Sequence, residues 1–525
     1  MEELAIAHKS LKRKLKKYDT FETLWVIYSY FQNAYYDRNF PTSVHPHPAY
    51  IQNKKIVLFP SKATVALRES ILYCGYRANT QEKWIMYPAN FWDFWDTINN
   101  LTWEAYQLGS DEHDENRISF ELYRLANQQF KWQSIFSNYE EYMNIYYYLF
   151  SDPDLEDVIH ATIWLKAIEY YAIGYLFLCN FTDKFALKSD FSFIDEWFRD
   201  IISKEKIDKF VENFSIDIDE LRTKMWDKQE YDKWFEYHGI VDLLSYPLIK
   251  ISKLWAWYYC SPILPIFIKA LAEWIYFRCL RNKTAGMSWI FGSKYWLRFQ
   301  KLCEINISKY LHNTNIKWWH DEELSRHNRQ DDKWNDSDFY FIEDNCLLFL
   351  ESKTKIIPES SYITAKEADF INELETWVDY LCQCYSTINR YLNWDFQHCI
   401  DSWVINIYPI LVTPNDLFFW FATDNNSIIN KIDWMLFEAF CKNWLDPEMI
   451  KKYPYSFLTI QQLPIFISLI DRFTILRVME TFLKGKYRHY NLSEIAREEF
   501  GLNEHFWVIT EVNLWDEISR VVLWK

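Results

Sequence analysis

Apolar residues recur at three- and four-residue spacing along much of the first 285 residues, and this spacing is typical of helices with one buried face. Residues 157–177 and 210–237 show the pattern most clearly. Glu156 and Asp157 lie at the start of the first of these segments, where acidic side chains stabilise a helix N-terminus. We therefore expect residues 1–285 to form a large, mostly α-helical N-terminal region.

The pattern changes after Gly286. Residues 296–311 again predict a helix, but residues 339–342 and 346–350 are short apolar runs that predict strands. Glu343-Asp344-Asn345 separates the two runs, and Asp-Asn is favourable turn chemistry for a β-hairpin.

Further elements follow the predicted hairpin. Residues 365–392 predict a long helix, residues 404–412 and 463–469 predict strands, and residues 471–483 predict another helix. Helices mixed with a few strands indicate an α/β domain with a small mixed sheet over residues 286–490. Residues 491–525 are expected to be a C-terminal extension packed on the core.

Composition excludes several classes of protein. Half of the 525 residues are hydrophobic, so the chain is not a disordered polymer. Its 57 basic and 73 acidic residues give a net charge of −16, so a general basic coat for nucleic acid is absent. With 8 glycines in the chain, neither a P-loop nor a dinucleotide-binding fingerprint is present.

Cysteines and apolar runs bear on location. The ten cysteines are scattered without a C-x-x-C pair, which favours reduced core thiols in a cytoplasmic protein. The most membrane-like stretch, residues 243–280, has an uncharged run of 15 residues at 254–268, shorter than the roughly 20 that a span needs. Buried helices around proline bends are the preferred interpretation, with peripheral membrane binding as a minor alternative.

Glu351 and Lys353 carry the strongest chemical signal. They directly follow a predicted buried strand, and the two-residue period of a strand puts both side chains on one face of the sheet. A hairpin turning at Asp344-Asn345 pairs Glu351 with Asp338, at the start of the partner strand. The hairpin therefore predicts two carboxylates side by side, with a lysine next to them.

Two adjacent carboxylates repel each other and need a cation. Oxygen ligands with open positions suit Mg²⁺ or Mn²⁺, and a nearby lysine can orient a metal-bound water or stabilise charge on a phosphate. Two alternatives stay open. The carboxylates and Lys353 can form an ordinary cross-strand ion pair at a strand end. Asp336 is also an alternative to Asp338 as the carboxylate on the first strand of the hairpin.

These residues resemble the active-site hairpin of the PD-(D/E)xK phosphodiesterase superfamily, the restriction-endonuclease-like fold. The resemblance covers residues 286–490 and departs from the pattern in having Ser337 before the first acid. It implies that Asp338 and Glu351 hold the metal together with the Ser352 backbone carbonyl. It also implies that Lys353 positions the attacking water.

The resemblance extends to neighbouring residues. The family's preceding helix often bears a glutamate that reaches the metal, and Glu304 is the candidate in this chain. Lys355, His320 and His327 are candidates for phosphate contacts, although solvated or bystander side chains are the simpler interpretation for all three.

The leading functional hypothesis is a metal-dependent nuclease, with DNA a more favoured substrate than RNA. Its helical N-terminal region would sense or dock a protein partner or a second copy of the chain. By analogy, this arrangement resembles prokaryotic defence nucleases. The alternative is a catalytically inactive nuclease-fold scaffold, which the charge of −16 and the aromatic-rich helices favour.

Overall fold

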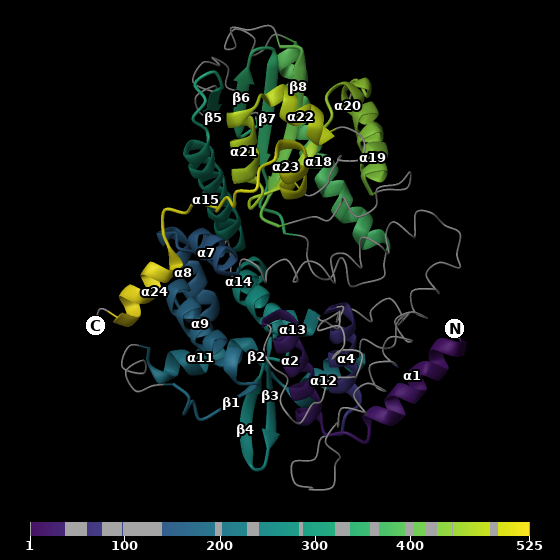
Figure 1. The fold of residues 1–525 in the computed structure, drawn as a ribbon, viewed down its shortest axis with the longest axis vertical. Coiled ribbons are helices and arrows are strands. Elements are labelled where there is room, and N and C mark those ends of the chain that lie inside the picture. Colours follow the sequence, from purple (N-terminus) through teal and green to yellow (C-terminus); the bar gives the residue numbers. More distant parts are fainter. Residues whose placement is uncertain are drawn as a thin grey trace.

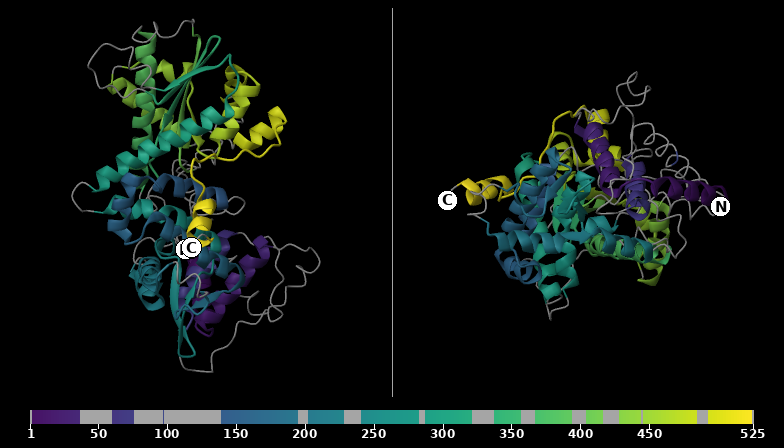
Figure 2. Two further views of the ribbon diagram at one scale, coloured as in Figure 1. Left: turned by 90° about the vertical axis from the view of Figure 1, so that its left-hand side faces the viewer. Right: turned by 90° about the horizontal axis from the view of Figure 1, so that it is seen from below.

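A computed structural model gives the fold of the chain. It describes residues 2–36, 60–75, 97, 139–194, 202–227, 241–282, 287–320, 337–356, 367–393, 404–415, 428–443, 445–483 and 492–523. The protein is a mostly helical α/β protein with two small mixed sheets, one in each half of the chain. The two sheets lie toward opposite ends of the long axis (Figures 1 and 2).

The helices and strands of the N-terminal half are α1 (Glu2–Leu15), α2 (Thr20–Tyr36), α4 (Pro60–Tyr73), α7 (Tyr139–Phe150), α8 (Pro153–Ile163), α9 (Ala167–Asp183), β1 (Ala186–Lys188), α11 (Lys204–Phe214), β2 (Ser215–Asp217), α12 (Ile218–Asp227), α13 (Val241–Ser245), β3 (Leu248–Lys253), β4 (Ala256–Cys260) and α14 (Leu264–Arg281).

Those of the C-terminal half are α15 (Met287–Tyr310), β5 (Lys317–His320), β6 (Phe339–Glu343), β7 (Cys346–Ser352), α18 (Glu367–Leu392), β8 (Asn406–Thr413), α19 (Ile428–Lys442), α20 (Glu448–Lys452), β9 (Ser456–Thr459), α21 (Leu463–Arg472), α22 (Ile475–Leu483), α23 (Leu492–Phe500) and α24 (Leu514–Leu523).

The N-terminal half contains a four-stranded sheet of order β1-β4-β3-β2, which the sequence analysis did not predict. The interpretation of residues 243–280 as buried helices was wrong for its first part, since β3 and β4 form a hairpin there. In β3, buried Ile249 and Ile251 alternate with more exposed Lys250 and Ser252, which is a strand period. No helix in the described ranges is long and apolar enough to cross a membrane.

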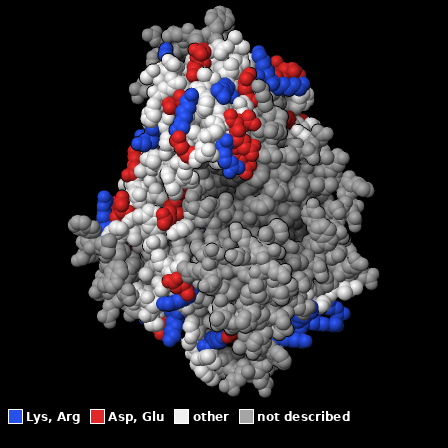
Figure 3. All heavy atoms as spheres, viewed as in Figure 1, with Lys and Arg blue, Asp and Glu red and all other residues white. Residues whose placement is uncertain are grey.

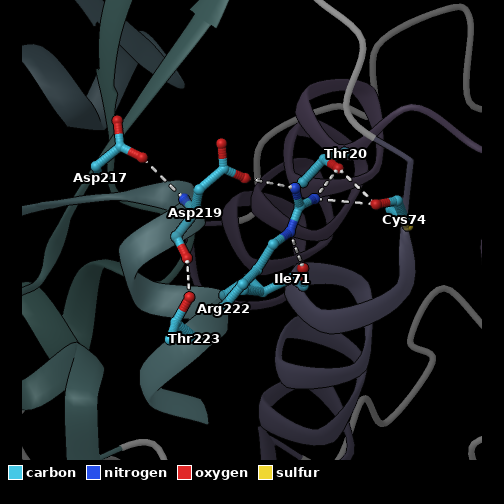
Figure 4. Close-up of polar contacts among 7 residues, drawn as sticks. All are labelled: Thr20, Ile71, Cys74, Asp217, Asp219, Arg222 and Thr223. Atoms are coloured by element: carbon cyan, nitrogen blue, oxygen red, sulfur yellow. Dashed lines mark hydrogen bonds and ion pairs between the residues drawn. The ribbon is translucent and has the colours of Figure 1, made fainter. Parts of the chain in front are cut away.

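Arg222 of α12 ties the first helices to this sheet region (Figure 4). Its guanidinium donates to the carbonyl oxygens of Ile71 at 2.7 Å and Cys74 at 2.9 Å, at the end of α4. It also donates to the hydroxyl of Thr20 at the start of α2, at 2.8 Å. One side chain therefore satisfies carbonyls left open at a helix C-terminus and joins three helices.

The C-terminal half is built on a five-stranded mixed sheet of order β5-β6-β7-β8-β9. Strands β5, β6 and β7 are antiparallel neighbours, while β8 and β9 run parallel to β7. One face packs against α15 and α21, and the other against α18 and α19. The predicted helices at 296–311 and 365–392, the hairpin and the strand at 404–412 are confirmed as α15, α18, β6–β7 and β8.

The strand predicted at residues 463–469 is wrong, because this segment is the helix α21. Pro464 lies in its first turn, where proline is tolerated. Buried Leu463, Phe466, Ile467 and Ile470 follow the spacing of one helix face. The fifth strand is instead β9, whose four residues are too short to give a clear alternating pattern.

Helix α15 and the C-terminal segment connect the halves. Helix α15 contacts α7, α8 and α14 of the N-terminal half as well as α21 and β7 of the C-terminal half. The last residues return to the N-terminal helices, where α24 contacts α7 and α9 (Figure 1). There the rings of Tyr175 and Trp515 meet at 4.7 Å between centroids. The C-terminal extension thus packs on both halves.

Candidate active site

The hairpin β6–β7 brings the two predicted carboxylates to the same end of the sheet. Its register pairs Phe339 with Leu350, so the next position of the ladder sets Asp338 opposite Glu351, as the turn at Asp344-Asn345 predicts. Asp344 has a φ of 50°, a left-handed conformation that Asp tolerates in such turns. The register of the site therefore follows from the turn.

Asp338 is almost fully buried and accepts hydrogen bonds at both carboxylate oxygens. Gln300 of α15 donates to Oδ1 at 2.9 Å. The backbone N–H and the hydroxyl of Ser352 donate to Oδ2 at 2.6 and 2.5 Å. These donors come from α15 and from the end of β7, so the Asp338 carboxylate is held between the helix and the neighbouring strand.

Glu351 is buried beside Asp338 and pairs with Lys353, whose Nζ lies 2.5 Å from Glu351 Oε1. Burial and then the charge of Asp338 raise the pKa of Glu351 to about 8, although Lys353 opposes this rise. Burial alone would lower the pKa of Lys353, but the carboxylates of Glu351 and Asp338 outweigh it and the pKa rises. The Lys353 ammonium also lies 4.9 Å from the ring centroid of Tyr380.

Gln300 occupies the place that the sequence analysis assigned to Glu304. Glu304 is about one-third exposed and pairs with Lys301 at 2.9 Å, so the structure does not bring it to the carboxylates. The missed signal is a polar Gln300 within the buried stripe of α15, between buried Phe299 and Cys303. A buried polar side chain needs a partner, and Asp338 is that partner.

The Ser352 carbonyl has the orientation expected of a ligand. Ser352 N–H points toward Asp338, and the N–H and C=O of one strand residue point to the same side. The next residue points the other way, since Lys353 N–H donates to the Val412 carbonyl of β8 at 2.9 Å. The Ser352 carbonyl therefore faces the Asp338 side of β7.

The remaining candidates lie at the edges of the site. Lys355 pairs with Glu373 of α18 at 2.7 Å. His320 lies on the edge strand β5, with its ring 5.2 Å from that of Phe339. His327 and Asp336 lie outside the described residues, so the choice between Asp336 and Asp338 rests on the position of Asp338 alone.

Two buried thiols flank the carboxylates. Burial raises the pKa of Cys303 and of Cys384 well above the ordinary value, and neighbouring carboxylates add to the effect. A thiol that stays protonated is a poor nucleophile and a poor metal ligand. These cysteines are packing residues, as the sequence analysis expected, and nucleophilic chemistry at this site does not depend on them.

The donor set fits a hard divalent cation. Asp338, Glu351 and Lys353 would carry an excess negative charge if both carboxylates were ionised. Burial and then the charge of Asp338 raise the pKa of Glu351, so a cation is needed to keep both carboxylates ionised at neutral pH. Within the described ranges, no group of three His, Cys, Asp or Glu side chains is placed to hold a metal. The protein would therefore supply Asp338, Glu351 and the Ser352 carbonyl, with water at the other positions, as Mg²⁺ prefers.

Comparisons of this chain with protein-family models, with curated proteins and with solved structures found no match. The geometry of Asp338, Glu351 and Lys353 and the resemblance of their motif are therefore the basis for a functional proposal.

Proposed function

We propose that the protein is a cytoplasmic, metal-dependent nuclease that hydrolyses phosphodiester bonds of nucleic acid, with DNA as the preferred substrate. The observation that carries the proposal is the pairing of two buried carboxylates, Asp338 and Glu351, at the end of a hairpin, with Lys353 at 2.5 Å from Glu351. A glutamate and a lysine closing a buried strand contribute little to packing, so a chemical role explains them better.

The arrangement of elements supports a restriction-endonuclease-like domain. A long helix, α15, precedes an antiparallel hairpin, and β8 and β9 extend the sheet in parallel beyond β7. Helices cover both faces. This order resembles the family core, although α21 replaces one of the strands that the resemblance implied.

Each side chain has a distinct role in this proposal. Asp338 and Glu351 would hold Mg²⁺ or Mn²⁺, which supplies an activated water and neutralises charge on the phosphate. Because the pKa of Lys353 is raised, its side chain is an ammonium at neutral pH. It therefore acts as a positive charge and hydrogen-bond donor toward water or phosphate and not as a general base.

The surface suggests that substrate contacts are local. On the face drawn in Figure 3, basic and acidic side chains of the described residues are interspersed over the C-terminal half. With a net charge of −16, most of the molecule repels a phosphate backbone. We propose that the N-terminal region docks a partner or a second copy that delivers or controls the substrate, as in a defence-type effector.

The test is a cleavage assay on circular plasmid, linear duplex and single-stranded RNA with Mg²⁺, Mn²⁺ or EDTA. Lys353→Ala should reduce metal-dependent cleavage on the order of a hundredfold or more, and far-ultraviolet circular dichroism should show that the variant is still folded. Lys355→Ala is the matched control, because this lysine also follows β7 but pairs with Glu373. Unchanged cleavage by Lys353→Ala, or an equal loss in both variants, would exclude the assignment.

A catalytically inactive scaffold is the second candidate. It is favoured by one observation: both oxygens of Asp338 already accept hydrogen bonds from Gln300 and Ser352, as in a purely structural polar cluster. Metal binding separates the two functions. An active site should raise the melting temperature as Mg²⁺ or Mn²⁺ is added, whereas a structural cluster should give no metal-dependent shift.

A further inference from the structure

A cavity of about 480 Å³ lies in the N-terminal half and shares no lining residue with the carboxylate site. Helices α12, α13 and α14 and the residues next to them form its walls. The volume is within the range of small-molecule sites, roughly 300 to 1,000 Å³. The lining residues that matter for its chemistry are Tyr246, Lys269, Glu273, Phe277, Arg278 and Arg281.

The walls carry uncompensated positive charge. Among the described residues, no carboxylate lies within ion-pair distance of Arg278 or Arg281, whereas Lys224 pairs with Glu220 and Lys269 with Glu273. Asp242 is the other acidic residue in the lining. Within the described residues, half-buried Arg278 and exposed Arg281 therefore line the cavity without an ion-pair partner, and this arrangement attracts an anion.

Arg278 is already oriented for such a ligand. Its guanidinium stacks on the ring of Trp274 at 4.6 Å and lies 5.7 Å from that of Tyr246. Stacking uses the face of the guanidinium and leaves N–H donors along its edge, which match two oxygens of a phosphate. Half-buried rings of Tyr246 and Phe277 also line the cavity and offer apolar surface to a planar group.

We propose that this cavity binds a nucleoside phosphate, with Arg278 and Arg281 contacting the phosphates and the rings of Tyr246 and Phe277 packing against the base. The ligand is small, anionic and partly aromatic, which accounts for the volume, the two arginines of the lining and the half-buried rings together.

Helix α14 connects the cavity to the carboxylate site, a step that rests on the proposed function. Glu273 accepts a hydrogen bond from Asn415, two residues beyond β8, at 3.0 Å. Tyr276 donates to the carbonyl oxygen of Thr354, directly after Lys353, at 3.2 Å. A ligand that shifts α14 therefore acts on both strands at the carboxylate end, and occupancy should change the cleavage rate by about fivefold or more.

The experiment is calorimetric titration of the full-length protein with ATP, ADP and pyrophosphate, without nucleic acid. ATP should bind saturably and more tightly than pyrophosphate. Arg278→Ala should weaken ATP binding by about tenfold or more. Arg278→Lys keeps the positive charge but lacks the paired N–H donors of the guanidinium, so it should weaken ATP binding less than Arg278→Ala does. Arg477→Ala is the matched control, because Arg477 also stacks on a ring, that of Phe473 at 4.8 Å, outside the cavity.

Absence of binding by all three compounds at millimolar concentration, or equal affinity in Arg278→Ala, would overturn the proposal. Equal affinity for pyrophosphate and ATP would overturn the nucleoside part. The cleavage assay with and without ATP is scored separately. Binding that depends on Arg278 in a protein that cuts no substrate would refute the nuclease function and leave the cavity's assignment standing.

Discussion

Asp338 and Glu351 lie side by side but are held in different ways. Asp338 accepts three hydrogen bonds from Gln300 and Ser352, so its position is fixed by α15 and β7. The side chain of Glu351 depends mainly on Lys353, and its charge is disfavoured by burial and by Asp338. Glu351 is therefore the residue at this site whose charge responds to pH.

This difference predicts a pH dependence of stability. The pKa of Glu351 is raised from its ordinary value of 4.5 to about 8, so between these values the folded protein binds a proton that the unfolded chain has released. The free energy of unfolding should fall as pH rises from about 5 to 8, by at most about 1.4 kcal/mol per pH unit. Glu351→Gln cannot titrate and should flatten this slope in urea denaturation without added metal. An identical slope in both proteins would show that Glu351 is ionised across the range.

Substitutions at two positions of α15 separate the roles of Gln300 and Glu304. Gln300→Ala removes a donor from a buried carboxylate and should cost about 1–3 kcal/mol, and it should also lower cleavage because Asp338 loses one of the three hydrogen bonds that hold it. Glu304→Ala removes a half-exposed ion pair with Lys301, worth about 0–1 kcal/mol, and should leave cleavage unchanged. Parallel denaturation and cleavage measurements decide between them, and loss of cleavage in Glu304→Ala alone would restore its assignment as a metal ligand.

At the scale of elements, the β3–β4 hairpin has an unusual turn. Leu254 and Trp255 have φ values of 49° and 69°, a left-handed conformation that costs an ordinary residue about 1 kcal/mol or more. Their side chains are 73% and 84% exposed, so packing does not explain the choice. Asn and Gly are the residues that this turn prefers.

The combined change Leu254→Asn and Trp255→Gly should therefore stabilise the protein by about 1 kcal/mol, measured as a higher urea midpoint. Trp257→Gly is the contrasting change, because Trp257 lies within β4 in an ordinary strand conformation and glycine weakens a strand interior. Its effect should have the opposite sign. Destabilisation by the turn change would mean that the exposed Leu254 and Trp255 make contacts that stabilise the fold.

Elements defined by local rules were predictable, and those defined by distant partners were not. The hairpin register follows from Asp344-Asn345 and placed Asp338 opposite Glu351. Strand β9 has only four residues, and it is a strand because β8 lies beside it. The apolar run of α21 fits a strand or a helix face equally well until its partners are known. Gln300 likewise gains its role from Asp338, 38 positions away.

At the scale of the whole molecule, α14 joins the two halves through a buried charge. Glu273 pairs with Lys269 and accepts hydrogen bonds from Tyr142 of α7 and Asn415 beyond β8. Tyr146 of α7 donates to the same Asn415 at 2.9 Å. A carboxylate buried this deeply is tolerated because Lys269, Tyr142 and Asn415 donate to it, so the network makes the packing of the two halves specific.

Glu273→Leu should therefore be among the most destabilising changes in the chain. It leaves the ammonium of Lys269 buried without a counter-charge and removes the acceptor for Tyr142 and Asn415, at a cost of about 3–5 kcal/mol. Adding Lys269→Met should recover much of this loss, since an apolar pair replaces the buried ion pair. Glu212→Ala, which breaks an exposed pair with Lys209, is the control and should change stability by less than about 1 kcal/mol.

Urea denaturation followed by both far-ultraviolet circular dichroism and tryptophan fluorescence measures the unaltered protein and the three variants. If Glu273→Leu were as mild as Glu212→Ala, the buried network could not be what fixes α14 between the halves, and the route from the cavity to the carboxylates would lose its physical basis.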